Sequence, residues 1–332
     1  MAGPHSFPTV GHSMKSALLN VFIAAVVLLS SACPTTGNGE ALPLGPFLPQ
    51  HVWPISGTGK PDFPLSSTFG PRLKASEGYR YDFHRGIDIP VPRGTAVRAI
   101  ADGVVRLSGN YSSYSDPLVQ VRHTRPGSEA GPKEPASYYS NYMHLSVTVV
   151  KEGQRVKRGQ IVGYSGTSQT GFEHLHFEIR DGGIHQKHCI HPLLVLPYED
   201  SGPPGLTITH VSTENPARPR VGVTITTGYR EVDFNRVEVC ICQKRKGRIL
   251  CQRAYDTIQW NRQFTPARSP HIFLDDPAFN AVEVRPAPFN ASSQVYRVDF
   301  TFLLQNPAKG DDIVVKARAG DVEGNVAEAS LP

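Results

Sequence analysis

Short stretches of alternating apolar and polar residues, cut by glycine and proline, run through most of this 332-residue chain. Stretches such as GTAVRAIADGVVRLSG, PLVQVRH and HLHFEIR have the length and composition of strands bounded by turns. The 30 glycines and 29 prolines make the chain rich in turns, and long helical periodicity is hard to find. This pattern predicts an all-β protein.

Turn signals divide the predicted strands into two groups. In residues 62–197 the strands alternate with glycine turns, and YEDSGPPG marks a linker over residues 198–205. Residues 206–332 carry about seven more short strands, a number typical of an immunoglobulin-like β-sandwich. Within the first group, residues 125–137 are rich in turn-forming residues and predict an enlarged loop between two strands.

Residues 1–33 have the features of an export signal. Lys15 precedes the apolar run 17–29, which is followed by a small-residue cleavage site ending at Ala32. The alternative, a single membrane anchor, is disfavoured because the run is short for a bilayer and contains Asn20. We therefore expect export to the periplasm or cell envelope.

Cys33 lies where a bacterial lipoprotein carries its lipidated cysteine, which predicts an anchor in the outer membrane. Leu29 lies one residue farther from Cys33 than is usual in such signals, so ordinary cleavage after Ala32 stays an alternative. Residues 34–61 then form a tether, because the stretch is small, polar and broken by proline. Contact with the membrane is expected only through such an anchor.

The chain carries a formal net charge of +5 and has a pI of about 8.9. This mild basicity suits an anionic polymer such as cell wall and is too weak to indicate nucleic acid. A basic hairpin tip at residues 244–248 hints at an anionic partner, although such runs are mostly solvated turns. The second group of strands is expected to dock on the wall, to bind an envelope protein, or to act as a spacer.

Apart from Cys33, the chain has four cysteines, an even number that suits disulfides in an oxidising compartment. The segment VEVCICQKRKGRILCQRAY predicts a hairpin in which Cys240 faces Cys251, so a cross-strand disulfide is expected there. A slip of one residue in the register would favour another partner. Zinc binding by these cysteines is disfavoured because neither a CxxC knuckle nor a second pair is present.

The stretch GFEHLHFEIR, residues 171–180, places His174, His176 and Glu178 at alternate positions with apolar residues between them. In a strand, this spacing directs the apolar residues into the core and the polar residues to the opposite surface. Two imidazoles side by side can hold a metal ion, or hold it and do acid–base chemistry beside it. The plainer alternative is a polar face with two incidental histidines.

Two other segments add side chains of the same kind. In FHRGIDIP, glycine and proline argue against a helix, and in an extended segment His84 and Asp88 share a face with Gly86 between them. The segment NYMHLS adds His144. Together with the paired histidines, these residues form a nitrogen and oxygen set suited to Zn²⁺, for which three protein ligands and one water indicate a catalytic site.

These segments resemble the motifs of the lysostaphin/LytM-type zinc endopeptidases. The resemblance covers about residues 62–197 and leaves the second group of strands untouched. It rests on STFGPR at 67–72, HRGID at 84–88, GTAVRA at 94–99, YMHL at 142–145 and GFEHLHFE at 171–178. It implies a LytM-like β-sheet or β-barrel peptidase domain that precedes the predicted sandwich.

The resemblance also implies a role for each site residue. His84, Asp88 and His176 are expected to bind one Zn²⁺ per chain, with water in the fourth position. His144 and His174 are expected to flank that water and the scissile carbonyl as general base and general acid, in an order that the sequence leaves open.

Glu178 is the candidate for orienting a ligand imidazole, since it shares a strand face with His176. The alternative is a carboxylate on the surface. Two positions depart from the family pattern: Glu173 stands where proline is common, and His191 stands where an aspartate is usual. Neither departure removes an expected ligand.

The leading functional hypothesis is therefore a zinc endopeptidase that uses zinc-activated water and two histidines to hydrolyse peptide cross-links of bacterial peptidoglycan. Its partners are then the stem peptides of the wall. One alternative is a non-enzymatic LytM-like envelope module that binds or activates cell-wall hydrolases. Another is a zinc protease that acts on proteins.

Overall fold

The computed structural model describes most of the chain from residue 51 onward. The predicted signal, residue 33 with its predicted anchor, and most of the tether lie outside the described residues, as does most of the predicted loop at 125–137. The described residues are 51–56, 65–114, 116–125, 128, 136–198, 202–211, 220–227, 232–243, 249–265, 267–277, 279–288, 296–304 and 313–331. Within these ranges, no helix is both long and apolar enough to cross a lipid bilayer.

The central region, residues 51–198, consists of strands and short 3₁₀ helices. Its strands are β1 (Gly70–Lys74), β2 (Arg80–His84), β3 (Ile87–Ile89), β4 (Ala96–Arg98), β5 (Gly103–Gly109), β6 (Leu118–Thr124), β7 (Ser137–Met143), β8 (Leu145–Thr148), β9 (Arg155–Val156), β10 (Ile161–Thr167), β11 (Glu173–Asp181) and β12 (Cys189–Ile190). The 3₁₀ helices are η2 (Ala75–Glu77), η3 (Gln186–His188) and η4 (Pro192–Leu194).

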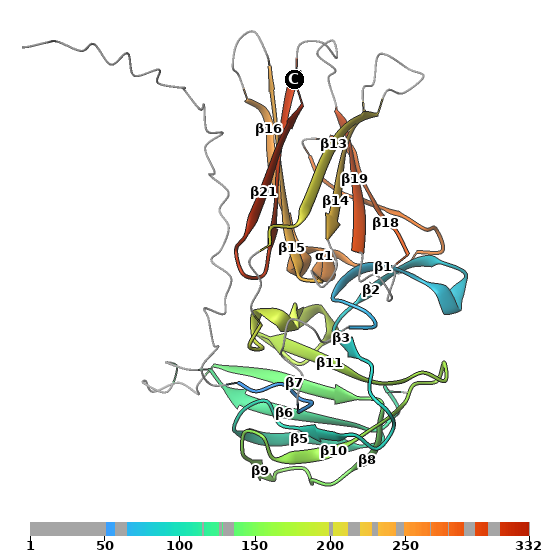
Figure 1. Cartoon of the computed structure of the whole chain (residues 1–332), viewed down its shortest axis with the longest axis vertical. Helices are drawn as coiled ribbons and strands as arrows, with labels where there is room; N and C mark the ends of the chain where they lie inside the picture. Colours follow the sequence, from blue (N-terminus) through green and yellow to red (C-terminus); the bar gives the residue numbers. More distant parts are fainter. Residues whose placement is uncertain are drawn as a thin grey trace, which may run out of the picture. The chain divides into compact units, whose positions relative to one another are not determined.

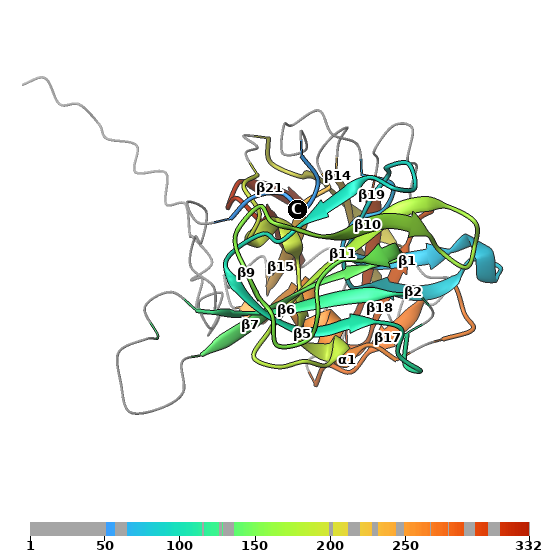
Figure 2. The ribbon, with the colours of Figure 1, turned by 90° about the horizontal axis from the view of Figure 1, so that it is seen from below.

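Most of these strands belong to one ten-stranded sheet with the order β4-β10-β11-β7-β6-β5-β9 (Figures 1 and 2). β3 and β12 also pair with β11, and β8 pairs with β10. β11 is therefore an interior strand with antiparallel partners on both sides. β1 and β2 form a separate antiparallel hairpin outside this sheet.

β11 shows how alternation in the sequence specifies this sheet. Leu175, Phe177 and Ile179 point to one face and are fully buried in the main core of the central region. On the polar face, His176 and Glu178 are buried and His174 is partly exposed, so the expected polar surface is found only at the start of the strand. Glu178 and Arg180 can both be buried there because their charges pair with each other.

The C-terminal region, residues 205–331, consists of two antiparallel sheets with the orders β13-β14-β19-β18-β17 and β16-β15-β20-β21. Side chains of β15, β18, β19 and β20 share one apolar core. The elements are β13 (Gly205–Val211), β14 (Arg220–Thr227), β15 (Phe234–Gln243), β16 (Ile249–Asp256), α1 (Thr257–Gln263), β17 (Ile272–Leu274), β18 (Phe279–Pro286), β19 (Tyr296–Leu304), β20 (Ile313–Asp321) and β21 (Val326–Leu331).

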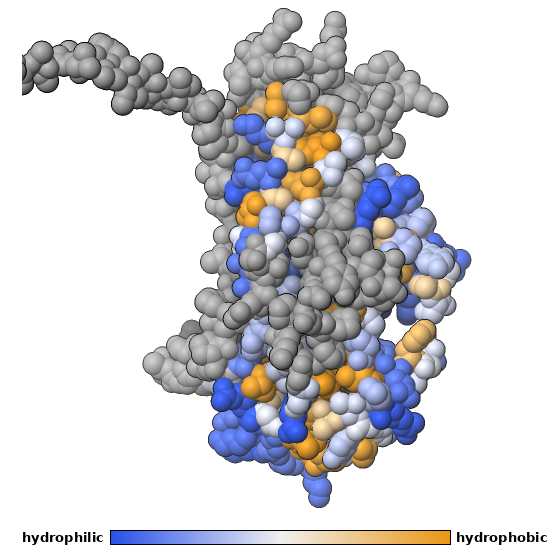
Figure 3. All heavy atoms as spheres, viewed as in Figure 1, coloured by the Kyte–Doolittle hydropathy of each residue, from blue (hydrophilic) through white to orange (hydrophobic). Residues whose placement is uncertain are grey.

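The predicted all-β class is confirmed. The immunoglobulin-like topology of the C-terminal region and the domain boundaries placed from the sequence stay predictions. On the face shown in Figure 3, hydrophobic residues are interspersed with hydrophilic ones. Large exposed apolar side chains, such as Val147, Phe172 and Phe273, belong to different elements. Scattered exposure of this kind is ordinary for a folded protein and does not by itself indicate an interface.

The register of the predicted cysteine hairpin differs from the expectation by one residue. Cys240 lies opposite Gln252, and Ile241 lies opposite Cys251, because the pairing of β15 and β16 shifts after Ile241. Cys240 is disulfide-bonded, while Cys189 and Cys242 carry free thiols. The side chain of Cys251 and the basic tip at 244–248 lie outside the described residues, so the Cys240–Cys251 disulfide stays a prediction.

A buried histidine on β6 makes the fold sensitive to acid. The ring nitrogens of His123 lie 2.9 Å from the carbonyl oxygen of Asp102 and 2.7 Å from the hydroxyl of Ser140. Burial lowers the pKa of His123 to about 4, so the imidazole is neutral in the folded protein.

We expect the free energy of unfolding to fall as the pH is lowered from about 6.5 to 4, because the unfolded chain then binds a proton that folded His123 does not. The shift corresponds to about 3 kcal/mol from this group. The His123→Gln variant should show a shallower slope in urea titrations at several pH values in the presence of a chelator. An unchanged slope would contradict this origin of the acid sensitivity.

Candidate metal centre

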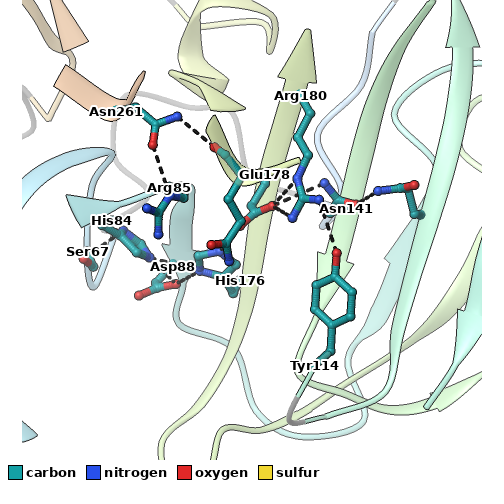
Figure 4. Close-up of polar contacts among 12 residues, drawn as sticks. Ser67, His84, Arg85, Asp88, Tyr114, Asn141, His176, Glu178, Arg180 and Asn261 are labelled. Atoms are coloured by element: carbon teal, nitrogen blue, oxygen red, sulfur yellow. Dashed lines mark hydrogen bonds and ion pairs between the residues drawn. The ribbon is translucent and has the colours of Figure 1, made fainter. Parts of the chain in front are cut away.

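Three chain segments bring His84, Asp88 and His176 together (Figure 4). His84 is the last residue of β2, Asp88 is the middle residue of β3, and His176 lies on β11. Asp88 and His176 are directly opposite each other in the antiparallel pairing of β3 with β11. The geometry of the sheet therefore fixes two of the three side chains, and the β1–β2 hairpin supplies the third.

The prospective ligand atoms form a tight triangle. His84 Nε2 lies 3.1 Å from Asp88 Oδ1 and 3.0 Å from His176 Nδ1, and the Asp88–His176 distance is 2.8 Å. In a tetrahedral site with zinc–ligand bonds near 2.0–2.1 Å, ligand atoms lie about 3.3 Å apart. The triangle is within a few tenths of an ångström of that requirement.

Hydrogen bonds on the far sides of both rings indicate the tautomers that a metal ion needs. His84 Nδ1 lies 2.8 Å from the Thr68 carbonyl oxygen, which can only accept, so its proton is on Nδ1. His176 Nε2 lies 3.3 Å from Glu178 Oε1, which places its proton on Nε2. Two lone pairs and a carboxylate oxygen then face one point, an arrangement that is repulsive without positive charge between them.

The pKa values of the three side chains are shifted by the same close approach. Burial lowers the pKa of His84 to about 4. Burial acts against charge on His176 too, but hydrogen bonds to Asp88 and Glu178 outweigh it and raise the His176 pKa to about 9. The neighbouring imidazoles likewise outweigh burial at Asp88 and hold its carboxyl pKa well below the usual value. A divalent cation bound by these atoms replaces the proton.

Glu178 lies within a buried polar network behind His176. Its side chain is 2% exposed, so the alternative of a surface carboxylate is wrong. Arg180 Nε donates to Glu178 at 2.9 Å, and the Asn141 amide lies 3.3 Å from the same carboxylate. Burial raises the pKa of Glu178, but the charge of Arg180 and the bond to His176 outweigh it and bring that pKa to about 2. Glu178 is thus an anion held at a fixed distance from His176.

His144 and His174 lie beside the triangle. Their ring centroids are 4.9 Å apart, and the His144 ring centroid is 5.8 Å from that of His176. His144 Nδ1 lies 2.6 Å from Asp116 Oδ2, whereas His174 Nδ1 lies 3.1 Å from the Phe172 carbonyl oxygen. Asp116 can accept a proton donated by Nδ1 of His144, so that ring keeps its Nε2 lone pair. Nε2 of His174 lies 3.6 Å from Asp88 Oδ1, on the side of the triangle.

The backbone at His144 has a φ of +57°, which is uncommon for a residue other than glycine. Such conformations occur where the surrounding structure holds a side chain in a required position. Burial and the neighbouring His176 lower the pKa of His144, although Asp116 opposes the shift. His144 is therefore neutral at neutral pH and able to accept a proton.

The two departures from the family pattern have local roles in the structure. Glu173 accepts a hydrogen bond from the backbone N–H of Arg93 at 2.9 Å. His191 is the N-cap of η4, where its Nδ1 accepts from the backbone N–H of Leu193 at 3.3 Å. An aspartate would cap this helix in the same way. Neither residue is a member of the triangle.

Sequence reasoning missed Asp116 and Thr68. Asp116 lies just before β6 and 28 positions before its partner His144, and no periodic pattern connects the two. Thr68 contributes through its backbone carbonyl, which gives no residue-type signal. Both contacts depend on the tertiary fold.

Part of the chain is similar to a known class of peptidase. Residues 82–188 match Peptidase family M23, so the chain contains an M23 peptidase domain of the LytM type. This range includes the three residues of the triangle and the two histidines beside it, His144 and His174.

Proteins similar to this domain include wall enzymes and an activator. The peptidoglycan DD-endopeptidase ShyC of Vibrio cholerae is 36% identical over 37% of this chain and 26% of its own length. The murein hydrolase activator NlpD of Escherichia coli is 34% identical over 44% of this chain and 31% of its own. The chain spans about a quarter of the length of the first curated relatives that it matches.

Among solved structures, the catalytic domain of the antimicrobial peptidase lysostaphin from Staphylococcus simulans is 26% identical. The match covers 40% of this chain and 90% of that one, with a TM-score of 0.33.

Gly86 provides a test of the packing around the site. A Cβ at Gly86 would lie 2.3 Å from the Phe177 carbonyl oxygen and 2.9 Å from His176 Nε2. Both distances are too short, so we expect Gly86→Ala to displace the His176 ring and weaken zinc binding by tenfold or more. Zinc titration with a competing chelator measures this effect. Gly182→Ala is the control, because it replaces a glycine away from the triangle. Equal zinc affinity in Gly86→Ala and Gly182→Ala would contradict the packing argument.

Proposed function

We propose that this protein is a zinc-dependent endopeptidase that hydrolyses peptide cross-links of bacterial peptidoglycan. The observation that carries the proposal is the convergence of His84, Asp88 and His176 on one point, with His144 and His174 beside it. A structural zinc site has no need of two further imidazoles beside its ligands. The match to Peptidase family M23 supports the same conclusion.

In this proposal His84, Asp88 and His176 hold one Zn²⁺. When bound, the ion supplies a Lewis acid that polarises the scissile carbonyl and lowers the pKa of water. His144 is the general base, because Asp116 keeps the proton on Nδ1 and stabilises the imidazolium that forms when Nε2 accepts a proton. The proposed role of His174 is to hydrogen-bond the reacting oxygen or the leaving amine, because its Nδ1 faces a backbone carbonyl and its Nε2 lies 3.6 Å from Asp88.

The substrate is proposed to be the D-alanyl–diaminopimelate link of a Gram-negative wall. The name of the similar ShyC, a peptidoglycan DD-endopeptidase, supports this bond. Export through the predicted signal would bring the enzyme to the periplasm, and an anchor at Cys33 would retain it at the outer membrane. The predicted envelope-protein partner of the C-terminal region stays a proposal, as does direct binding of that region to the wall.

A second candidate function is activation of wall hydrolases without catalysis, favoured by the similarity to NlpD. An activator needs neither a bound metal nor a general base. In this chain, three side chains of metal-binding type and two further histidines form one cluster. Asp116 orients one of those histidines. The endopeptidase is therefore the function that the site supports best.

We expect His144→Ala to bind zinc as the natural protein does but to lose at least a hundredfold in turnover, because it removes only the proposed base. His176→Ala should lose both zinc and turnover, because it removes a ligand. Mass spectrometry of products from defined muropeptides measures turnover, and metal analysis of purified protein measures zinc. His185→Ala removes an exposed histidine and is the control. Undiminished cleavage by both site variants would exclude the proposed mechanism.

Asp116→Asn tests how His144 is oriented. The amide retains an acceptor for Nδ1–H but removes the charge that stabilises an imidazolium, so we expect a fall of roughly ten- to a hundredfold in kcat with little change in KM. Asp102→Asn is a matched control, since that carboxylate is exposed and bonds Lys157. Wild-type kcat in Asp116→Asn would show that the carboxylate has no part in the reaction.

A further inference from the structure

The β1–β2 hairpin that carries His84 forms a two-stranded sheet of its own, separate from the ten-stranded sheet (Figure 1). Tyr81 and Phe83 on β2 are buried, as is Phe69 just before β1, and all three belong to the core cluster of the C-terminal region. Their cluster partners include Phe234 and Trp260. The hydrophobic effect that holds this hairpin in place is therefore exerted mainly by the C-terminal region.

Phe264, just after α1, lies against the residues that flank His84. Its ring stacks on Tyr81 with centroids 5.8 Å apart and lies 6.1 Å from the ring of Phe83. The guanidinium of Arg85 lies 4.9 Å from the centroid of the same ring. One aromatic side chain of the C-terminal region thus contacts the residue before His84 and the residue after it.

Asn261, on α1, adds a polar connection at the same place (Figure 4). Its amide oxygen accepts a hydrogen bond from Arg85 Nε at 3.1 Å. Its amide nitrogen donates to the carbonyl oxygens of Gln186 at 2.8 Å and Cys189 at 3.0 Å. Asn261 is buried, so loss of its side chain would leave these polar groups of the central region without their partner.

A third contact reaches His84 through Thr68. The backbone carbonyl of Thr68 accepts the Nδ1 proton of His84, and the Thr68 hydroxyl donates to the carbonyl oxygen of Val232 in the C-terminal region. The group that sets the tautomer of His84 is thus itself held by the C-terminal region. Asp88 and His176, by contrast, are positioned by direct pairing of β3 with β11.

We propose that the C-terminal region is a structural part of the metal centre, and that Asn261 and Phe264 are positioning residues for His84. This proposal rests on the proposed function only in taking zinc as the metal. A ligand held in place before binding loses less conformational freedom when the metal binds, so its support raises metal affinity. The C-terminal region would then be required for zinc retention, whatever else it binds.

The test is the zinc affinity of the full-length protein with Asn261→Ala or Phe264→Ala, measured by competition with a chromophoric chelator. We expect a dissociation constant at least tenfold higher than that of the natural protein for each variant. Phe273→Ala is the control, because that phenylalanine lies in the same region and is 59% exposed. Near-ultraviolet circular dichroism establishes that each variant is folded.

Wild-type zinc affinity in folded Asn261→Ala and Phe264→Ala would overturn the proposal. If Phe264→Ala does not fold, the cycle of Arg85→Ala, Asn261→Ala and the double variant decides instead. If the double variant loses less zinc affinity than the sum of the two single losses, Arg85 and Asn261 act together, as proposed. If neither single variant changes zinc affinity, the proposal is contradicted. Because the readout is zinc binding, a protein that binds zinc tightly but leaves muropeptides intact would refute the endopeptidase proposal and not this one.

Discussion

The structure of the site depends on one electrostatic constraint: two imidazole lone pairs and a carboxylate oxygen face each other within about 3 Å, inside the protein. Such a cluster is stable only with positive charge at its centre. The raised pKa of His176 and the lowered pKa of Asp88 are both consequences of that demand. The surrounding contacts hold the rings so that a cation, once bound, meets lone pairs on both of them.

Those contacts come from two parts of the structure. Asp88 and His176 are held by the ten-stranded sheet, in which backbone pairing places them opposite each other. The buried Glu178–Arg180 ion pair lies behind His176 and adds to this support. For His84 the support is a two-stranded hairpin packed on the C-terminal region. A hairpin alone is marginally stable in water, so this ligand depends on its packing. The metal centre thus joins two regions that are distant in sequence.

The sequence predicted the all-β class because turn residues and period-two alternation are local signals. The alternation in β11 also indicated which residues share a face. The close approach of Gly86 to Phe177 and His176 was not predicted, because it depends on the pairing of distant strands. Asp116 and Asn261 could not be predicted, because each acts on a partner far away in the chain and leaves no periodic trace. The register of the cysteine hairpin was missed by one residue because a local shift after Ile241 is not encoded in alternation.

The central claim is that His84, Asp88 and His176 hold a single zinc ion. X-ray absorption at the zinc edge, on full-length protein loaded with one equivalent of zinc, tests it most directly. The account predicts only nitrogen and oxygen neighbours at roughly 2.0–2.2 Å, with two imidazoles. In the His84→Ala protein the contribution of one imidazole should be lost. Sulfur neighbours near 2.3 Å, or a spectrum unchanged in that variant, would place the metal elsewhere and contradict the account.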